Sequence, residues 1–212
     1  MNADNTYTLT SYDGDETEIY IATTYNDKTI SAIGKDAFYK RSDITSVTIA
    51  EGVKTIGDGA FYYCSSLSDV TIPSTLEEIG ELAFGFTSIK SVTIPEGVSA
   101  IGKGAFFGCS SLTSVTLPDG LTTIGETAFS CCTSLESLVI PSTVTSIGEL
   151  AFDGSTHLKT IYYEGTAQEW AEIDLGNNNV VLSNATIYYF SETQPTEEGN
   201  FWYYVDGEAT KW

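Results

Sequence analysis

Four cysteines are the residues of this chain best suited to metal binding or redox chemistry. Cys64, Cys109 and Cys132 are separated by 45 and 23 residues, and these spacings fit no zinc motif. Cys131 and Cys132 are adjacent, which places them poorly for a disulfide with each other. Because three of the four recur at one position of a repeat, we interpret them as a column of small buried side chains. We therefore predict reduced thiols, no metal site and no bound cofactor.

The single histidine, His157, is the other candidate for catalysis. It follows Cys132 by one repeat, so a Cys–His nucleophile pair is one hypothesis. However, His157 occupies the repeat position of Ser111 and Ser134, just before a core leucine, and no third group is indicated that would orient its ring. The acidic residues include no Asp-x-Asp-x-Asp-Gly calcium loop and no pair that stands out for hydrolysis. We predict that the chain is not an enzyme.

Composition and charge exclude further classes of protein. The chain has 212 residues, with 9 Lys and Arg against 29 Asp and Glu, for a formal net charge of −20. Such a chain repels phosphate groups, so we predict no nucleic-acid partner and no anionic membrane surface. No apolar run approaches the length of a membrane span and the first residues are too polar for a signal peptide, so we expect no membrane insertion. With 42% apolar and 12% aromatic residues, the chain can build a core.

A repeat organises most of the sequence. The hexapeptide Ile-Gly-x-x-Ala-Phe recurs in steps of 23 residues, with a single step of 22. Its six copies begin at Ile33, Ile56, Ile79, Ile101, Ile124 and Ile147. The short step arises after Phe84, where the residue that is Cys in other copies is lacking.

Each copy predicts one turn of a repeat solenoid that is mainly β with short helical turns. Segments such as Val70–Ile72 alternate as a strand does, and the proline that follows, here Pro73, ends the strand. A second extended pair ends at Ile-Gly, and Ala-Phe then makes a brief helical turn whose Phe fills the centre of the coil. No unit can bury this apolar side alone, so the units must stack. We predict that Phe61, Phe84 and the two phenylalanines that follow in the repeat form one buried column.

These residues closely resemble the BspA-like, or Treponema-type, leucine-rich repeats over residues 30–165. The segment from Ile161 to Thr166, with Glu169-Trp170, also looks like the terminal cap of such proteins from gut bacteria. The resemblance implies a right-handed leucine-rich-repeat solenoid of 23-residue units with a parallel sheet on its concave side. It also implies an extracellular or cell-surface location and binding to host or bacterial surface proteins. The family brings no catalytic residues to carry over.

The ends of the solenoid need covering. Tyr7–Tyr12 and Glu18–Ile21 flank an Asp-Gly turn, which predicts an N-terminal hairpin cap and a degenerate first rung over residues 1–30. The solenoid is expected over 31–165. Thr166 and Glu169 form a capping-box pattern, which predicts a cap helix and a strand within 166–190. Residues 191–212 are expected to be a linker and a terminal β-hairpin around Asp206-Gly207.

Aromatic residues after Ala-Phe give the first candidate ligand-binding surface. The first four copies carry aromatic rings there and the last two carry none, although the demands of the core are the same in each copy. The residues are Tyr39, Tyr62, Tyr63, Phe86 and Phe107. An exposed row of such rings suits contact with protein or glycan. The alternative is that the rings fold over the turns and cover the edge of the core.

The outward face of the main sheet is the second candidate surface. It presents mostly Thr and Ser, which are ordinary exposed strand residues. Towards one end the pattern changes to Glu136, Val139 and Tyr162. That change is what a binding patch would add to the sheet.

We therefore predict a non-enzymatic, adhesin-like recognition module that binds a protein ligand, or a glycan, through an extended solenoid face, and that is a monomer. The alternative is a structural spacer or accessory domain of a larger exported protein. Trp202-Tyr203-Tyr204 and Trp212 also loosely resemble one cell-wall choline-binding repeat, although such repeats occur in tandem.

Overall fold

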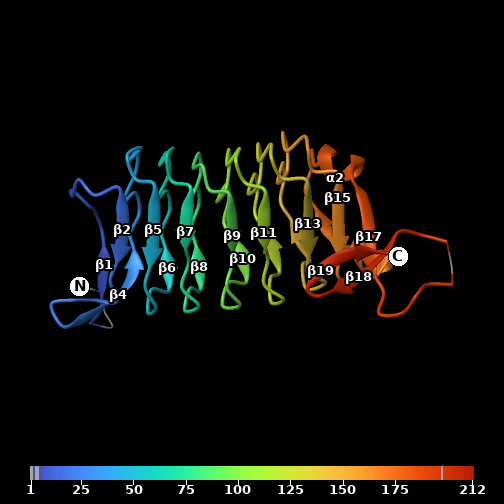
Figure 1. The fold of residues 1–212 in the computed structure, drawn as a ribbon, viewed down its shortest axis with the longest axis horizontal. Coiled ribbons are helices and arrows are strands. Elements are labelled where there is room, and N and C mark those ends of the chain that lie inside the picture. The colour runs from blue at the N-terminus through green and yellow to red at the C-terminus, as the bar shows by residue number, and fades with distance from the viewer. Residues whose placement is uncertain (1, 3–4, 197) are drawn as a thin grey trace.

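Each repeat forms one turn of an elongated β-solenoid of about 8 turns (Figure 1). The structure, a computed structural model, describes residues 2, 5–196 and 198–212. The turns lie side by side along the long axis, with the N-terminus at one end and the C-terminal hairpin at the other. The predicted repeat solenoid with almost no helix is confirmed.

The Val-x-Ile segments form the first column of parallel strands. In these strands apolar residues that point into the coil flank a residue that points outward, as Val47, Thr48 and Ile49 illustrate. The ladder is divided into three sheets, with interruptions between β7 and β9 and between β11 and β13. The strands are β2 (Glu18–Ile21), β5 (Ser46–Ile49), β7 (Asp69–Thr71), β9 (Ser91–Thr93), β11 (Ser114–Thr116), β13 (Ser137–Ile140), β15 (Thr160–Tyr163) and β17 (Thr186–Phe190).

The residues before Ile-Gly form the second column, a continuous parallel ladder of short strands. In it each Ile pairs with the Ile of the next turn, for example Ile124 with Ile147. Glycine must follow because the turns approach closely there: a Cβ on Gly148 would lie 2.4 Å from the backbone nitrogen of Glu126. The strands are β1 (Tyr7–Leu9), β4 (Lys28–Ile33), β6 (Thr55–Ile56), β8 (Glu78–Ile79), β10 (Ala100–Ile101), β12 (Thr123–Ile124), β14 (Ser146–Ile147) and β16 (Asp174–Leu175).

The third side of each coil consists of successive hydrogen-bonded turns. The N–H of Tyr62 donates to the carbonyl of Gly59 within its own turn, at 2.9 Å. The N–H of Phe61 donates to Ala83 of the next turn, at 2.8 Å. Two positions of every turn have left-handed backbone: the fourth residue of the hexapeptide, and the second residue after Phe. At the second position φ is 60° for Lys40, 61° for Tyr63, 55° for Phe86, 71° for Gly108, 59° for Cys131 and 73° for Gly154.

The phenylalanines of the hexapeptide form the centre of the core, as predicted. Their rings are fully buried and nearly parallel, with centroids 5.5 Å apart between Phe84 and Phe106 and 5.4 Å apart between Phe106 and Phe129. The stack also includes Phe38 at one end and Phe152 at the other. One ring from each copy of the hexapeptide therefore fills the centre of the coil, from Phe38 to Phe152.

The cysteine position is a second buried column, which supplies donors to the core backbone. The thiol of Cys64 donates to the carbonyl of Phe38 at 3.1 Å, and the hydroxyl of Ser155 donates to Phe129 at 2.7 Å. In the repeat that is one residue short, Thr87 fills the position, and its hydroxyl donates to Phe84. The column therefore adds side-chain donors to the carbonyl groups of the phenylalanines, some of which also accept a backbone N–H, as Phe38 does from Arg41.

The N-terminal hairpin prediction is wrong. β1 pairs in parallel with β4, and β2 pairs in parallel with β5, so the two predicted arms belong to different columns. The Asp-Gly signal is overridden because Ile19 and Ile21 of β2 enter the core beside the strand of the next turn. A small hairpin forms instead between β3 (Thr24–Tyr25) and β4.

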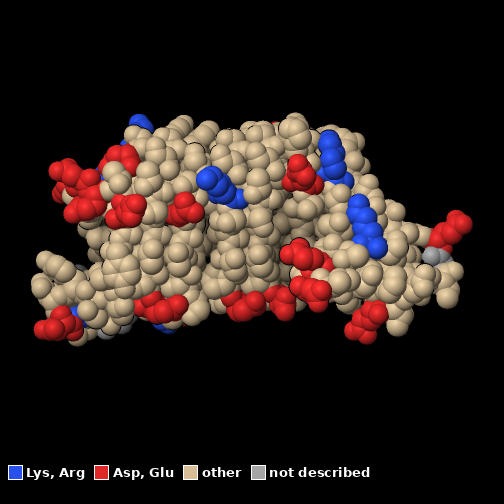
Figure 2. All heavy atoms as spheres, viewed as in Figure 1, with Lys and Arg blue, Asp and Glu red and all other residues tan. Residues whose placement is uncertain are grey.

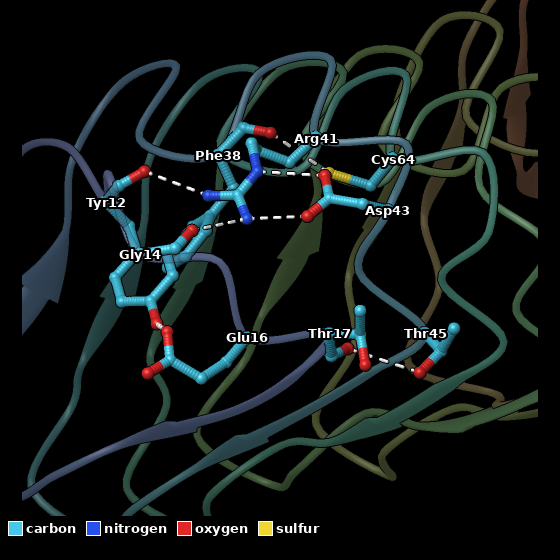
Figure 3. Close-up of polar contacts among 9 residues, drawn as sticks. All are labelled: Tyr12, Gly14, Glu16, Thr17, Phe38, Arg41, Asp43, Thr45 and Cys64. Carbon is cyan, nitrogen blue, oxygen red and sulfur yellow. Dashed lines mark hydrogen bonds and ion pairs between the residues drawn. The ribbon is translucent and has the colours of Figure 1, made fainter.

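Arg41 fixes this N-terminal segment to the first turn (Figure 3). It occupies the repeat position of the buried cysteines, and its guanidinium donates to the carbonyls of Tyr12 and Gly14 at 3.1 and 2.8 Å. The guanidinium also pairs with Asp43 at 2.6 Å, and this hydrogen bond lowers the pKa of the Asp43 carboxyl. The Tyr12 ring covers Phe38, the end of the ring stack, at 5.6 Å. Arg41 thus holds in place the segment whose Tyr12 ring covers the core at this end.

The C-terminal end is closed by two short helices and a hairpin. α1 (Ala167–Glu172) begins with the capping box of Thr166 and Glu169. α2 (Val180–Asn184) was not predicted, and it buries Leu182. β18 (Phe201–Val205) and β19 (Glu208–Lys211) form an antiparallel hairpin that continues the sheet from β17. Trp202 is fully buried, and its indole N–H donates to the carbonyl of Tyr163 at 2.8 Å.

We expect Phe106→Ala to lower the free energy of unfolding by about 3–5 kcal/mol, because it leaves a ring-sized cavity inside the stack. Urea titration followed by far-UV circular dichroism measures this loss. Tyr20→Ala is the control, since Tyr20 is 68% exposed, and it should change the stability by less than about 0.5 kcal/mol. A loss below about 1 kcal/mol for Phe106→Ala would show that the ring stack is not the core.

We expect the thiols of Cys64, Cys109 and Cys132 to be unreactive in the folded protein. Burial raises the pKa of Cys64 to about 12 and that of Cys109 to about 11, so neither thiol forms the reactive thiolate near neutral pH. A Cys131→Ser variant removes the half-buried fourth thiol, and the remaining three should react with a chromogenic thiol reagent only after unfolding. Rapid labelling of the folded variant, or stoichiometric zinc by elemental analysis, would contradict this.

Candidate functional site

The five aromatic residues named above form one continuous cluster, here called the aromatic strip (Tyr39, Tyr62, Tyr63, Phe86 and Phe107). Ring centroids are 5.9 Å apart between Tyr39 and Tyr62, and 4.5 Å apart between Tyr62 and Tyr63. Tyr63 stacks on Phe86 at 4.7 Å, and Phe86 meets Phe107 edge to face at 5.0 Å. The sequence asymmetry therefore corresponds to rings that touch across four consecutive turns.

Glycines in the following turns leave room for the rings. A Cβ on Gly85 would lie 2.9 Å from the ring of Tyr62, and one on Gly108 would lie 2.7 Å from Phe86. Both rings lie flat against the chain and are half-buried. Tyr39 and Tyr63 are more open, at 42% and 39% exposure. The strip thus covers the turns with its inner rings and presents its outer rings to solvent.

A hollow of about 420 Å³ adjoins one end of the strip. Tyr39 and Tyr62 form one border, and the carboxylates of Asp36, Asp58 and Glu81 lie among the other lining residues. Burial, and then its contact with Tyr63, raises the pKa of the Tyr62 hydroxyl, so this group stays a hydrogen-bond donor. The hollow therefore combines aromatic faces with acceptor oxygens.

The structure brings together only two of the three residues of the second candidate surface. Val139 and Tyr162 pair in register on β13 and β15, and both line a groove of about 470 Å³. Tyr162 contacts the ring of Trp202 at 5.4 Å. Glu136 is exposed at the start of β13 and does not line this groove. The strip lies on the turn side of the coil, so the two surfaces do not meet.

The C-terminal hairpin forms one wall of the groove, and sequence reasoning missed this. Tyr204 of β18 donates a hydrogen bond to Glu164, just after β15, and so holds the hairpin across the sheet. Burial and then this bond raise the pKa of the Tyr204 hydroxyl. The hairpin itself was predicted, but no pattern in the sequence indicates where it folds back.

The candidates for chemistry do not come together. His157 is exposed, and its Nδ1 lies 2.6 Å from the carbonyl oxygen of Thr133. Cys132 is buried, and its thiol donates to Phe106. Lys103 and Glu126, which each follow the Ile-Gly pair of their repeat, form an ion pair at 2.9 Å on the surface. Trp202, which loosely resembles part of a choline-binding repeat, is fully buried, so its ring is not open to a ligand.

The described residues contain neither a group of metal ligands nor a membrane-spanning helix. In residues 2, 5–196 and 198–212, no three His, Cys, Asp or Glu side chains lie together as ligands for a metal ion. Within the same part of the chain, no helix has the length and apolar character needed to cross a membrane.

Comparison with known proteins relates the chain to other repeat proteins of similar architecture. A leucine-rich repeat protein of Treponema pallidum is 26% identical, with a TM-score of 0.76, over 83% of this chain and 81% of that one. A leucine-rich repeat protein of Bacteroides ovatus is 27% identical, with a TM-score of 0.60, over 79% of this chain and 53% of that one. The pneumococcal vaccine antigen PcpA is 26% identical, with a TM-score of 0.62, over 74% and 43%. This chain thus spans about half of the latter two.

A search of curated proteins finds no match. Residues 31–159 and 77–189 match the family described as the BspA type leucine rich repeat region, in six copies. That match spans more than half of the chain and coincides with the stacked turns. The chain therefore belongs to the BspA-type leucine-rich repeat family.

Proposed function

We propose that this chain is a non-enzymatic recognition module of the bacterial cell surface or of secreted proteins, and that it binds a protein partner through the aromatic strip. Membership of a repeat family whose proteins are typically extracellular or on the surface supports this location. The partner is a host or bacterial surface protein, and a monomer of this chain presents the whole strip.

The backbone of Tyr63 and Phe86 is the observation that carries the proposal. Both residues have left-handed backbone, with φ of 61° and 55°. This conformation costs a bulky residue on the order of 1–3 kcal/mol, and glycine avoids that cost. Gly108 and Gly154 occupy the same position in later turns. Lys40 and Cys131 also occupy this position, so the fold accepts side chains there, and the pair of large adjacent rings supports a role outside the fold.

The charge of the chain favours a cationic partner. A net charge of −20 attracts positive charge over long range, which speeds encounter and is screened by salt. Charge alone gives little specificity. The half-exposed rings supply the short-range apolar contact, since tyrosine is enriched among the residues that dominate protein interfaces.

A glycan is the second candidate ligand, and the hollow beside the strip supports it. Sugar rings stack on aromatic faces such as Tyr39 and Tyr62, and sugar hydroxyls donate to carboxylates such as Asp36 and Asp58. A spacer role is the remaining alternative, in which the rings only cover the turns.

We expect the double variant Tyr63→Gly and Phe86→Gly to fold and to lose partner binding by roughly thirtyfold or more. Glycine suits the left-handed backbone at both positions, so the change removes rings without adding strain. The partner is first identified by screening the chain against extracellular-matrix and plasma proteins and against a glycan array. Biolayer interferometry then measures the affinity, and thermal unfolding verifies the fold.

The control is the double variant Tyr20→Thr and Tyr25→Thr, which removes two exposed rings elsewhere. It should bind the partner within about twofold of the unmodified chain. Equal affinity of the strip variant and the control would refute the strip as the binding surface. Absence of any ligand from both screens would favour the spacer.

A further inference from the structure

The groove beside the C-terminal hairpin lies over an interruption in the first strand column. β11 and β13 belong to different sheets, although they follow one another in the solenoid. The groove is lined by both strands, and it reaches the inward-facing side chains of Val115 and Leu138. Figure 2 shows the hollow on this face, beside the hairpin. The surface is therefore recessed at this interruption, one of the two in the column.

The groove wall is the open edge of a β-sheet. β19 is the last strand of its sheet and pairs only with β18. The N–H of Trp212 donates to the carbonyl of Phe201, so these two residues form a hydrogen-bonded pair. Along an antiparallel ladder, such pairs alternate with pairs whose backbone groups point away from each other. Lys211 and Ala209 consequently point their backbone N–H and C=O groups away from β18. Ala209 lines the groove, and its backbone N–H and C=O form no hydrogen bond with β18.

The charge of the lining selects the occupant. Glu96, Asp119 and Glu164 follow β9, β11 and β15 along one edge of the strand column, and Glu208 begins β19 of the hairpin. Among the described residues that line the groove, none is Lys or Arg. Lys211 of the edge strand turns away, with its ammonium group 4.4 Å from the centre of the Tyr188 ring. An open strand edge beside a groove lined by four carboxylates suits an extended segment with basic side chains.

We propose that this groove binds an extended basic peptide segment of a partner protein, which adds as a strand to β19. Backbone hydrogen bonds to Ala209 give the segment its direction and register. Its Lys or Arg side chains, which share one face of the strand at alternate positions, meet the carboxylates that line the groove. Its remaining side chains pack against the Thr and Ser face of β11. This site stands apart from the aromatic strip, and neither depends on the other.

Fluorescence anisotropy with a labelled ten-residue peptide of alternating Lys and Thr tests this site. We expect saturable binding, and none for the peptide of alternating Glu and Thr. The double variant Asp119→Asn and Glu208→Gln removes one carboxylate from the edge of the strand column and one from the hairpin, and should weaken binding about tenfold. The control Glu78→Gln with Asp153→Asn makes the same charge change at exposed positions away from the groove and should change the affinity less than twofold.

Two further probes test strand addition itself. Ala209→Pro removes an N–H that faces the groove and leaves the bonds between β18 and β19 intact, so binding should fall at least fivefold while the thermal unfolding curve is unchanged. A Lys-Thr peptide with N-methyl groups on alternate residues cannot pair and should also bind at least fivefold more weakly.

Absence of saturable binding to the Lys-Thr peptide would overturn the proposal. The same is true if the control loses as much affinity as the groove variant, which is the signature of a non-specific acidic field. Full binding by Ala209→Pro and by the N-methylated peptide would exclude strand addition. None of these results bears on the aromatic strip, because every variant leaves its rings in place.

Discussion

The stack of phenylalanine rings is the interaction on which the rest of this structure depends. A single turn cannot bury its ring, so each ring is buried only because its neighbours stack on it. Strands lie about 4.8 Å apart, and the rings can stay in contact only if every turn has nearly the same path. Glycine after each Ile of the hexapeptide follows from that requirement, as does a small hydrogen-bonding residue three positions after every hexapeptide Phe except Phe38. The left-handed positions that turn the chain follow from it as well.

The interior was predictable from the sequence because it repeats. The Ile-Gly-x-x-Ala-Phe period places Phe106 and its equivalents without knowledge of any distant contact. The short repeat shows the limit of this reasoning. The sequence pattern indicates that this copy lacks the residue at the cysteine position, whereas Thr87 fills that position in the structure. The N-terminal hairpin failed for a related reason. An Asp-Gly turn is a local signal, and burial of Ile19 and Ile21 against the next turn outweighs it.

The outer surfaces were predictable only in part, because they depend on what the repeat leaves free. The aromatic strip could be located, since its residues depart from the pattern at one repeat position. The groove could not, because it needs the hairpin to return across the sheet. Tyr204 reaches Glu164 from forty residues further along the chain, and no periodicity connects the two. A repeat pattern does not predict contacts that are made only by the unique segments at the ends of the solenoid.

The spacing of the turns also limits what the aromatic strip can bind. Four turns at about 4.8 Å give a row of rings roughly 15 Å long. This length exceeds a single amino acid or sugar ring, so a ligand that uses the whole row must itself be extended or present a flat surface. Because the turns support one another through the core, the rings stay aligned without a ligand, and little order has to be gained on binding. A rigid row of modest contacts therefore suits recognition of a large surface better than capture of a small molecule.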